Sequence, residues 1–160
     1  MNVTKTGRIT PFLWFDQNAE EAADFYVSIF PNSRRMGELK SDLDNKNLPP
    51  KGKAVTVSFE LDGLRFTALN GGPAHAGQFN EAISFVVSCE NQAEIDRYWS
   101  ALTADGGAEI ACSWLKDKFG LRWQIVPANI GELLSKPKAM QAMMTMKKLD
   151  IAALEAAGKE

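Results

Sequence analysis

The chain has 160 residues, of which 45% are hydrophobic and 24% charged, and its formal net charge is −2. These values are typical of a globular protein with one domain or two small modules sharing a core, and they exclude a broad basic surface for nucleic acid or anionic membranes. No apolar run approaches the roughly 20 residues that span a bilayer, and residues 1–8 lack the apolar stretch of a signal peptide. Two cysteines are too few for a disulfide framework. We therefore expect a reduced, cytoplasmic protein with no nucleic-acid or membrane partner.

The first half of the chain alternates between strand and helix patterns. Asp16 to Asn18 offer capping oxygens to a helix whose apolar residues recur every three or four positions. Asp62-Gly63 is a typical two-residue hairpin turn between two strands. A polar, proline-containing stretch at 41–53 predicts an exposed loop. The expected elements are a strand at 9–15, a helix from about 19 to Pro31, and strands at 34–39, 54–61 and 64–69.

The second half repeats this plan and then becomes helical. Gly106-Gly107 is expected to stop the helix, and Asp150 is expected to cap the last one. The expected elements are a strand at 82–88, a helix at about 91–105, strands at 108–111, 113–116 and 121–126, and tail helices at 130–134, 137–146 and 150–157.

The two halves also share short sequence motifs, which indicates an internal repeat. The motifs of the two helices match at an offset of 73 residues, with Phe25-Tyr26 corresponding to Tyr98-Trp99. The closing words, Gly63-Leu64-Arg65-Phe66 and Gly120-Leu121-Arg122-Trp123, match at an offset of 57. The first copy thus has 16 additional residues, most of them in the 41–53 loop. Such a repeat predicts two similar βαβββ modules with a cleft between them.

Paired modules of this kind resemble the vicinal oxygen chelate superfamily, which includes glyoxalase I, bleomycin-resistance proteins and extradiol dioxygenases. The runs 112–127 and 143–154 resemble its PhnB-like branch, often labelled 3-demethylubiquinone-9 3-methyltransferase. The resemblance implies an α+β fold in which two modules, 8–73 and 82–127, form a curved, partly open mixed-sheet barrel. A C-terminal helical tail at 128–158 completes a single structural domain, and the resemblance also implies a homodimer.

Metal-binding members of that superfamily hold a divalent cation with His or Glu side chains from the first and last strands of each module. The repeat register carries those positions onto Pro11, Thr67, Ser84 and Gln124, none of which is a standard ligand. The single histidine, His75, lies in the linker, where a solvated loop histidine is the ordinary interpretation. The sequence therefore predicts no bound metal.

A methyltransferase of the common kind needs a glycine-rich turn between a strand and a helix to bind its cofactor. Gly71-Gly72 instead precedes a proline and a linker, and Gly106-Gly107 follows a helix. The sequence thus predicts no cofactor and does not favour methyl transfer.

Residues that alternate along the strands are expected to face the cleft and bind a small organic ligand. Core packing is the alternative for the tryptophans, and a plain polar turn is the alternative for the lysine. The predicted ligand-binding residues are Trp14, Thr67, Asn70, Ser84, Trp114, Lys116, Phe119 and Gln124.

Cys112 is the candidate nucleophile, although no histidine lies close to it in sequence and an inert thiol is the ordinary alternative. Four of the six methionines lie in 140–146, on a helix that either packs its apolar stripe or forms an adaptable binding surface. We predict a metal-free small-molecule-binding protein that sequesters or senses its ligand. The alternatives are a superfamily enzyme acting on a small organic substrate, and a structural or regulatory dimer with a vestigial cleft.

Overall fold

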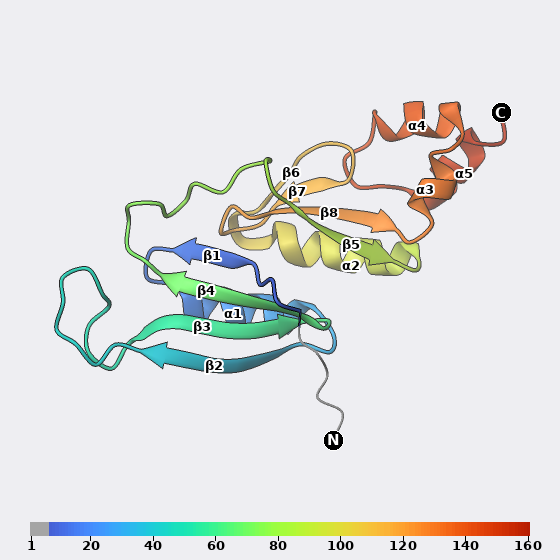
Figure 1. Ribbon diagram of the computed structural model, residues 1–160. Coiled ribbons are helices and arrows are strands. Elements are labelled where there is room, and N and C mark those ends of the chain that lie inside the picture. Colours follow the sequence, from blue (N-terminus) through green and yellow to red (C-terminus); the bar gives the residue numbers. More distant parts are fainter. Residues whose placement is uncertain (1–6) are drawn as a thin grey trace, which may run out of the picture. The chain divides into compact units, whose positions relative to one another are not determined.

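The computed structural model describes residues 7–160 (Figure 1). The prediction that residues 1–8 lack the apolar stretch of a signal peptide therefore falls mostly outside the described residues. The chain divides into two compact units, one ending at Gln78 and one spanning Phe79–Glu160. None of the helices between residues 7 and 160 is long and apolar enough to cross a bilayer.

The first unit is a four-stranded mixed sheet with one helix against it. Its elements are β1 (Phe12–Phe15), α1 (Ala19–Ile29), β2 (Arg34–Lys40), β3 (Ala54–Leu61) and β4 (Leu64–Asn70). The strand order is β1-β4-β3-β2, with β1 parallel to β4 and the other neighbours antiparallel. Helix α1 covers one face of this sheet (Figure 1). Tyr26 on that helix stacks on Phe59 of β3, which in turn stacks on Phe66 of β4.

The second unit repeats the arrangement and adds the tail. Its elements are β5 (Phe85–Cys89), α2 (Gln92–Thr103), η1 (Ala104–Gly106), β6 (Ala108–Glu109), β7 (Trp114–Lys116), β8 (Arg122–Pro127), α3 (Ile130–Leu133), α4 (Pro137–Met143) and α5 (Ile151–Ala157). The strand order is β5-β8-β7-β6, again with only the first pair parallel. The apolar face of α2, which includes Ile95 and Trp99, is buried against β8 and β7.

These elements confirm the predicted α+β fold of two βαβββ modules followed by helices. The described strands form two four-stranded sheets, and neither sheet closes into a barrel. β1 begins at Phe12 instead of Ile9, because Pro11 has no N–H to donate to a neighbouring strand. The carbonyl of Pro11 still accepts a hydrogen bond from the Thr67 amide at 3.0 Å.

The C-terminal tail packs on the second sheet rather than standing apart from it. Val126 of β8 forms a buried apolar cluster with Leu149 and Leu154. The Asp150 carboxylate accepts a hydrogen bond from the Ala153 amide at 2.9 Å, which confirms the predicted cap of the last helix.

The strand pairing corrects the repeat register by one residue. Leu13 pairs with Ala68 in the first unit, and Val87 pairs with Ile125 in the second. Since Ala68 and Ile125 are related by the 57-residue offset of the closing words, Leu13 corresponds to Val87, 74 residues later, and not to Val86. The helices keep the offset of 73, so the loop between the first strand and the helix is one residue shorter in the second unit.

Candidate functional site

The sheet face opposite α2 gathers the polar residues predicted in the second unit. Leu115 and Trp123 are buried on the α2 side, so their strand neighbours face the other way. Trp114 pairs with Gln124, and Lys116 pairs with Arg122. The structure thus brings together on one face four predicted residues from β7, β8 and the segment that leads into β5. They are Ser84, Trp114, Lys116 and Gln124.

A neutral hydrogen bond joins two of these residues. Gln124 donates from Nε2 to Ser84 Oγ at 2.9 Å, so an amide and a hydroxyl occupy the two positions to which the resemblance would assign metal ligands. The pair still offers the Gln124 carbonyl oxygen as an acceptor and the Ser84 hydroxyl as a donor. It can therefore orient a polar group of a small molecule.

Arg122 lies on the same face and was not singled out from the sequence, although it belongs to the repeated Gly-Leu-Arg word. Its guanidinium forms an ion pair with Glu81 at 2.9 Å and donates to the carbonyls of Phe79 and Gly120. A backbone hydrogen bond, followed by the hydrogen bond from Arg122, holds the pKa of Glu81 below its usual range. Together, Lys116 and Arg122 give this end of the face a basic character.

The hairpin turn beside this face depends on a buried acid that was not singled out from the sequence. Asp117 is 1% exposed. Its Oδ1 accepts hydrogen bonds from the amides of Phe119 and Leu121, and its Oδ2 accepts one from Trp123 Nε1 at 2.8 Å. Phe119, a predicted ligand-binding residue, lies in this turn with the Lys118 ammonium 5.3 Å from its ring centre.

In the first unit, Trp14 and Thr67 lie on the sheet face opposite α1. Trp14 Nε1 donates to the Gly72 carbonyl at 2.9 Å, and its ring meets the exposed His75 edge-on at 4.8 Å. A side chain at Gly71 would come within 2.3 Å of the Trp14 ring. Trp14 therefore holds the start of the linker against β1, and glycine at position 71 makes this close approach possible.

Asn70, also predicted to bind ligand, has both ends of its amide engaged within the first unit. Its Oδ1 accepts from the Ala19 amide at 2.8 Å, and its Nδ2 donates to Glu20 Oε2 and to the Ala54 carbonyl. It thus caps α1, whereas Asn18, which precedes that helix, makes no side-chain cap. A cavity of about 460 Å³ lies at this point, and Asn70 is one of its lining residues together with Glu21 and others of α1 and the 41–53 loop.

The donor set at the superfamily's metal positions does not fit a divalent cation. The second unit offers the hydrogen-bonded Ser84 and Gln124. In the first unit, the corrected register replaces Pro11 with Thr10 as the counterpart of Ser84, and Thr67 is the counterpart of Gln124. Hydroxyl and amide groups bind such ions far more weakly than imidazole and carboxylate. Between residues 7 and 160, no three His, Cys, Asp or Glu side chains gather where they could hold an ion.

The two cysteines have different environments. Cys89 is buried, and desolvation raises the pKa of its thiol to about 11. Cys112 is partly exposed, and its thiol donates to the Met144 sulfur at 3.8 Å. The candidate nucleophile therefore contacts the tail.

We expect a thiol reagent at pH 8 to label Cys112 and to leave Cys89 unmodified, because the thiolate is the reactive form. Mass spectrometry of the native protein treated with iodoacetamide should show one added group. A Cys112→Ser variant should show none until denaturant is added. Rapid labelling of that variant without denaturant would contradict the burial of Cys89.

The raised pKa of Cys89 also predicts how the free energy of unfolding depends on pH. Because burial raises this pKa to about 11, the contribution of the neutral thiol to that free energy should be complete below about pH 9 and should decrease above it.

Comparison with known proteins decides the family. The model of the 3-demethylubiquinone-9 3-methyltransferase family matches residues 7–126. The chain belongs to this family. The match confirms the PhnB-like resemblance and places the chain in the vicinal oxygen chelate superfamily.

Solved structures agree with this assignment. The PhnB protein of Bacillus cereus, which carries the same methyltransferase label, is 32% identical over 75% of this chain and 99% of its own, with a TM-score of 0.65. Protein PA1353 of Pseudomonas aeruginosa is 20% identical over 76% of this chain and 98% of its own, with a TM-score of 0.60. The fosfomycin resistance protein FosX of Listeria monocytogenes, complexed with Mn(II) and sulfate, is 16% identical over 81% of this chain and 96% of its own, with a TM-score of 0.51. The last two show a shared fold alone. No curated protein matches the chain.

Proposed function

We propose that this family member binds a small organic molecule without a metal ion, on the face of the second sheet opposite α2, and that it sequesters or senses that molecule. The observation that carries the proposal is the Gln124–Ser84 hydrogen bond at 2.9 Å, which places a neutral polar pair where related proteins would need charged or imidazole ligands. A ligand on this face would meet the Gln124–Ser84 pair, the indole of Trp114 and the ammonium of Lys116.

The charges and the aromatic ring indicate the kind of ligand. Lys116 and Arg122 favour a molecule with an anionic group, because opposite charges attract in a partly desolvated site. Arg122 is already paired with Glu81, so Lys116 is the cation better placed to meet the ligand. Trp114 offers an apolar surface for the ligand body. A small carboxylate-bearing or otherwise acidic organic compound suits this combination.

The methyltransferase label of the family gains no support from these residues. The face opposite α2 lacks the glycine-rich turn at a helix N-terminus that commonly binds such a cofactor. The superfamily-enzyme alternative also gains nothing from Cys112, whose thiol is directed to Met144.

Native mass spectrometry and elemental analysis of one freshly purified sample test the proposal. We expect protein without stoichiometric Mn, Fe, Ni or Zn, and an added organic mass when the ligand survives purification. Recovery of about one of these metals per chain would overturn the metal-free proposal. The same spectra would report whether the chain is the homodimer that the resemblance implies.

The Gln124–Ser84 pair should be necessary for binding, because truncating either partner leaves the other without its hydrogen bond. We expect Gln124→Leu to weaken capture of any acidic compound found in a ligand screen by about tenfold. Ser88→Ala is the matched control, since Ser88 is on β5 and faces the same side further along the strand. Equal affinities of the wild-type protein and Gln124→Leu would remove this pair from the site.

A further inference from the structure

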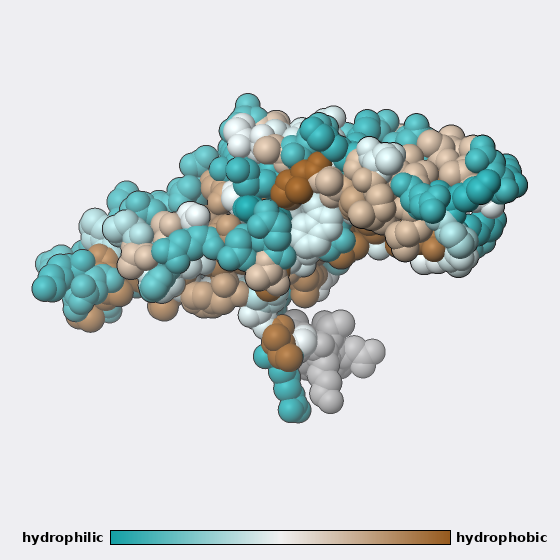
Figure 2. Space-filling view, turned by 90° about the horizontal axis from the view of Figure 1, so that it is seen from above, coloured by the Kyte–Doolittle hydropathy of each residue, from teal (hydrophilic) through white to brown (hydrophobic). Residues whose placement is uncertain are grey.

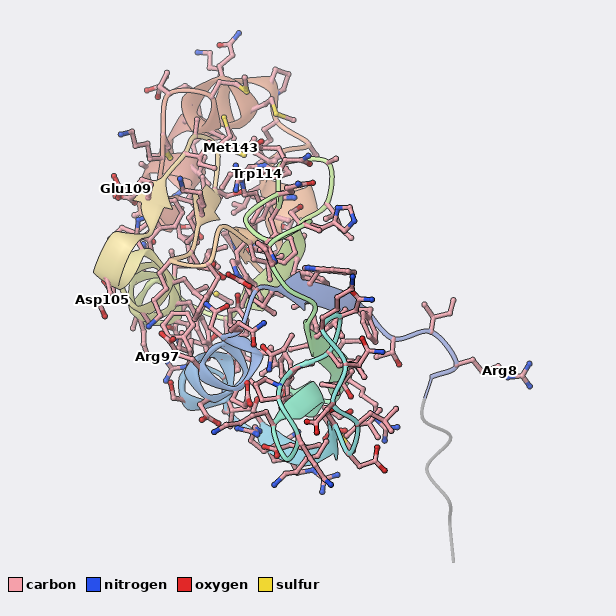
Figure 3. The ribbon with its side chains drawn as sticks, turned by 90° about the vertical axis from the view of Figure 1, so that its left-hand side faces the viewer. Arg8, Arg97, Asp105, Glu109, Trp114 and Met143 are labelled. Carbon is pink, nitrogen blue, oxygen red and sulfur yellow. The ribbon has the colours of Figure 1, made fainter. Side chains whose placement is uncertain are left out.

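The C-terminal tail presents a group of sulfur atoms that the proposed function does not use. Among the methionines of 140–146, Met143 and Met146 pack against the buried cluster of the tail. Met140 and Met144 remain 41% and 63% exposed. Figure 3 shows sulfur atoms, in yellow, on α4 near the labelled Met143, and Figure 2 shows weakly hydrophobic surface among hydrophilic residues over the tail helices. Two of the four tail methionines are thus packed, and the other two are exposed.

The two exposed methionines lie one helical turn apart. The amide of Met144, the residue that follows α4, donates to the Met140 carbonyl at 3.2 Å, so the two side chains leave neighbouring positions on the same side of this last helical turn. Exposed methionines contribute little to packing, and their thioethers are free to act as soft ligands.

The backbone holds Cys112 next to this pair. The Cys112 amide donates to the Met146 carbonyl at 2.8 Å, and the Ser113 amide donates to the Lys147 carbonyl at 2.9 Å. These bonds tie the segment before β7 to the chain that follows α4. They bring the Cys112 sulfur to 3.8 Å from the Met144 sulfur.

We propose that Cys112, Met144 and Met140 form a binding site for a soft monovalent cation, Cu(I). Thiolate and thioether ligands select Cu(I) over the harder divalent ions. Two sulfurs bonded to one ion at about 2.3 Å and at a tetrahedral angle lie about 3.8 Å apart, which is the separation already present. On binding, the Cys112 S–H bond breaks, a sulfur–copper bond forms and the proton passes to solvent, with no change in oxidation state.

This site is separate from the Gln124–Ser84 face and does not rest on the proposed function. Cys112 lies in the segment before β7 and the two methionines lie in the tail, whereas the proposed ligand contacts β7, β8 and Ser84, which precedes β5. Copper binding that is lost when Cys112 is replaced can therefore be distinguished from a metal bound at the superfamily's usual positions.

Anaerobic titration of the full chain with Cu(I), in competition with a chromophoric Cu(I) chelator, tests the site. We expect one Cu(I) per chain. Cys112→Ser should weaken the affinity about 100-fold and Met144→Leu about tenfold, since the first removes the charged ligand and the second a neutral one. Met36→Leu is the matched control, because Met36 is a partly exposed methionine on β2 of the other unit, and it should leave the affinity unchanged.

A second measurement locates the ion directly. With methyl-labelled methionine, Ag(I) as a redox-stable substitute should shift the NMR signals of Met140 and Met144 and leave that of Met36 in place. Circular dichroism of each variant would show that the fold is kept, which is expected for the volume-conserving exchange of Met for Leu. Wild-type affinity in Cys112→Ser, equal shifts for all methionines, or displacement of Cu(I) by equimolar Zn(II) would each overturn the proposal.

Discussion

Replacing Asn70 with alanine is expected to lower the free energy of unfolding of the first unit by about 2–4 kcal/mol. Asn70 is 5% exposed, and its amide joins the end of β4 to the first residue of α1 and to the start of β3. Alanine would leave the Ala19 amide and the Ala54 carbonyl without these partners at a site that water reaches poorly. Urea denaturation followed by circular dichroism, together with hydrogen exchange resolved by unit, would measure the loss.

Asn18→Ala is the matched control for this prediction. Asn18 immediately precedes α1 and has the residue type typical of a helix cap, yet its side chain caps nothing. It should change the free energy of unfolding by less than about 0.5 kcal/mol. If Asn18→Ala proved as destabilising as Asn70→Ala, the capping of α1 from β4 would be wrong.

Asp117→Asn is expected to destabilise the second unit by about 2–4 kcal/mol, although the two side chains have nearly the same shape. Three N–H donors converge on the two carboxylate oxygens of Asp117, and one of them is the Trp123 indole. An amide has a single acceptor oxygen, so at least one donor would face an NH2 group instead. The loss of a buried, charge-assisted hydrogen bond sets the size of the effect.

Two variants separate this network from ordinary turn effects. Trp123→Phe removes only the indole donor. Apart from the effect of the smaller ring, it should lower the free energy of unfolding less than Asp117→Asn does. Asp62→Asn, in the exposed hairpin turn of the first unit, should be nearly neutral, because asparagine tolerates the positive φ of 44° found there. Asp117→Asn with wild-type stability in urea would show that its three hydrogen bonds contribute little.

The strands with strict alternation were the best predicted from sequence. Residues 54–61 were predicted as a strand with the bounds that β3 has, because alternate side chains such as Val57 and Phe59 are buried and report the period directly. Two-residue β6 was predicted too long, since nothing in the sequence marks where a short edge strand stops pairing.

The candidate site was predicted unevenly, and the reason is physical. The shared face of four predicted residues could be found because strand alternation is visible in the sequence. These residues are Ser84, Trp114, Lys116 and Gln124. The correspondence between Pro11 and Ser84 was wrong, because a one-residue difference in a polar loop changes the strand register without altering any hydrophobic pattern. Asn70 and Asp117 were not recognised as buried network residues, since a polar side chain inside a turn signal looks the same whether it meets water or backbone amides.

The C-terminal tail limits the length of a ligand that can lie on the second sheet. On the face opposite α2, β8 presents Arg122, Gln124 and Val126 in turn, and Val126 is already covered by Leu149 and Leu154. Two-residue steps along a strand measure about 6.6 Å, so the uncovered part of β8 is roughly one such step long. A compound with the dimensions of a single ring or a short chain can lie along that stretch, whereas a peptide or a long acyl chain would meet the side of the tail.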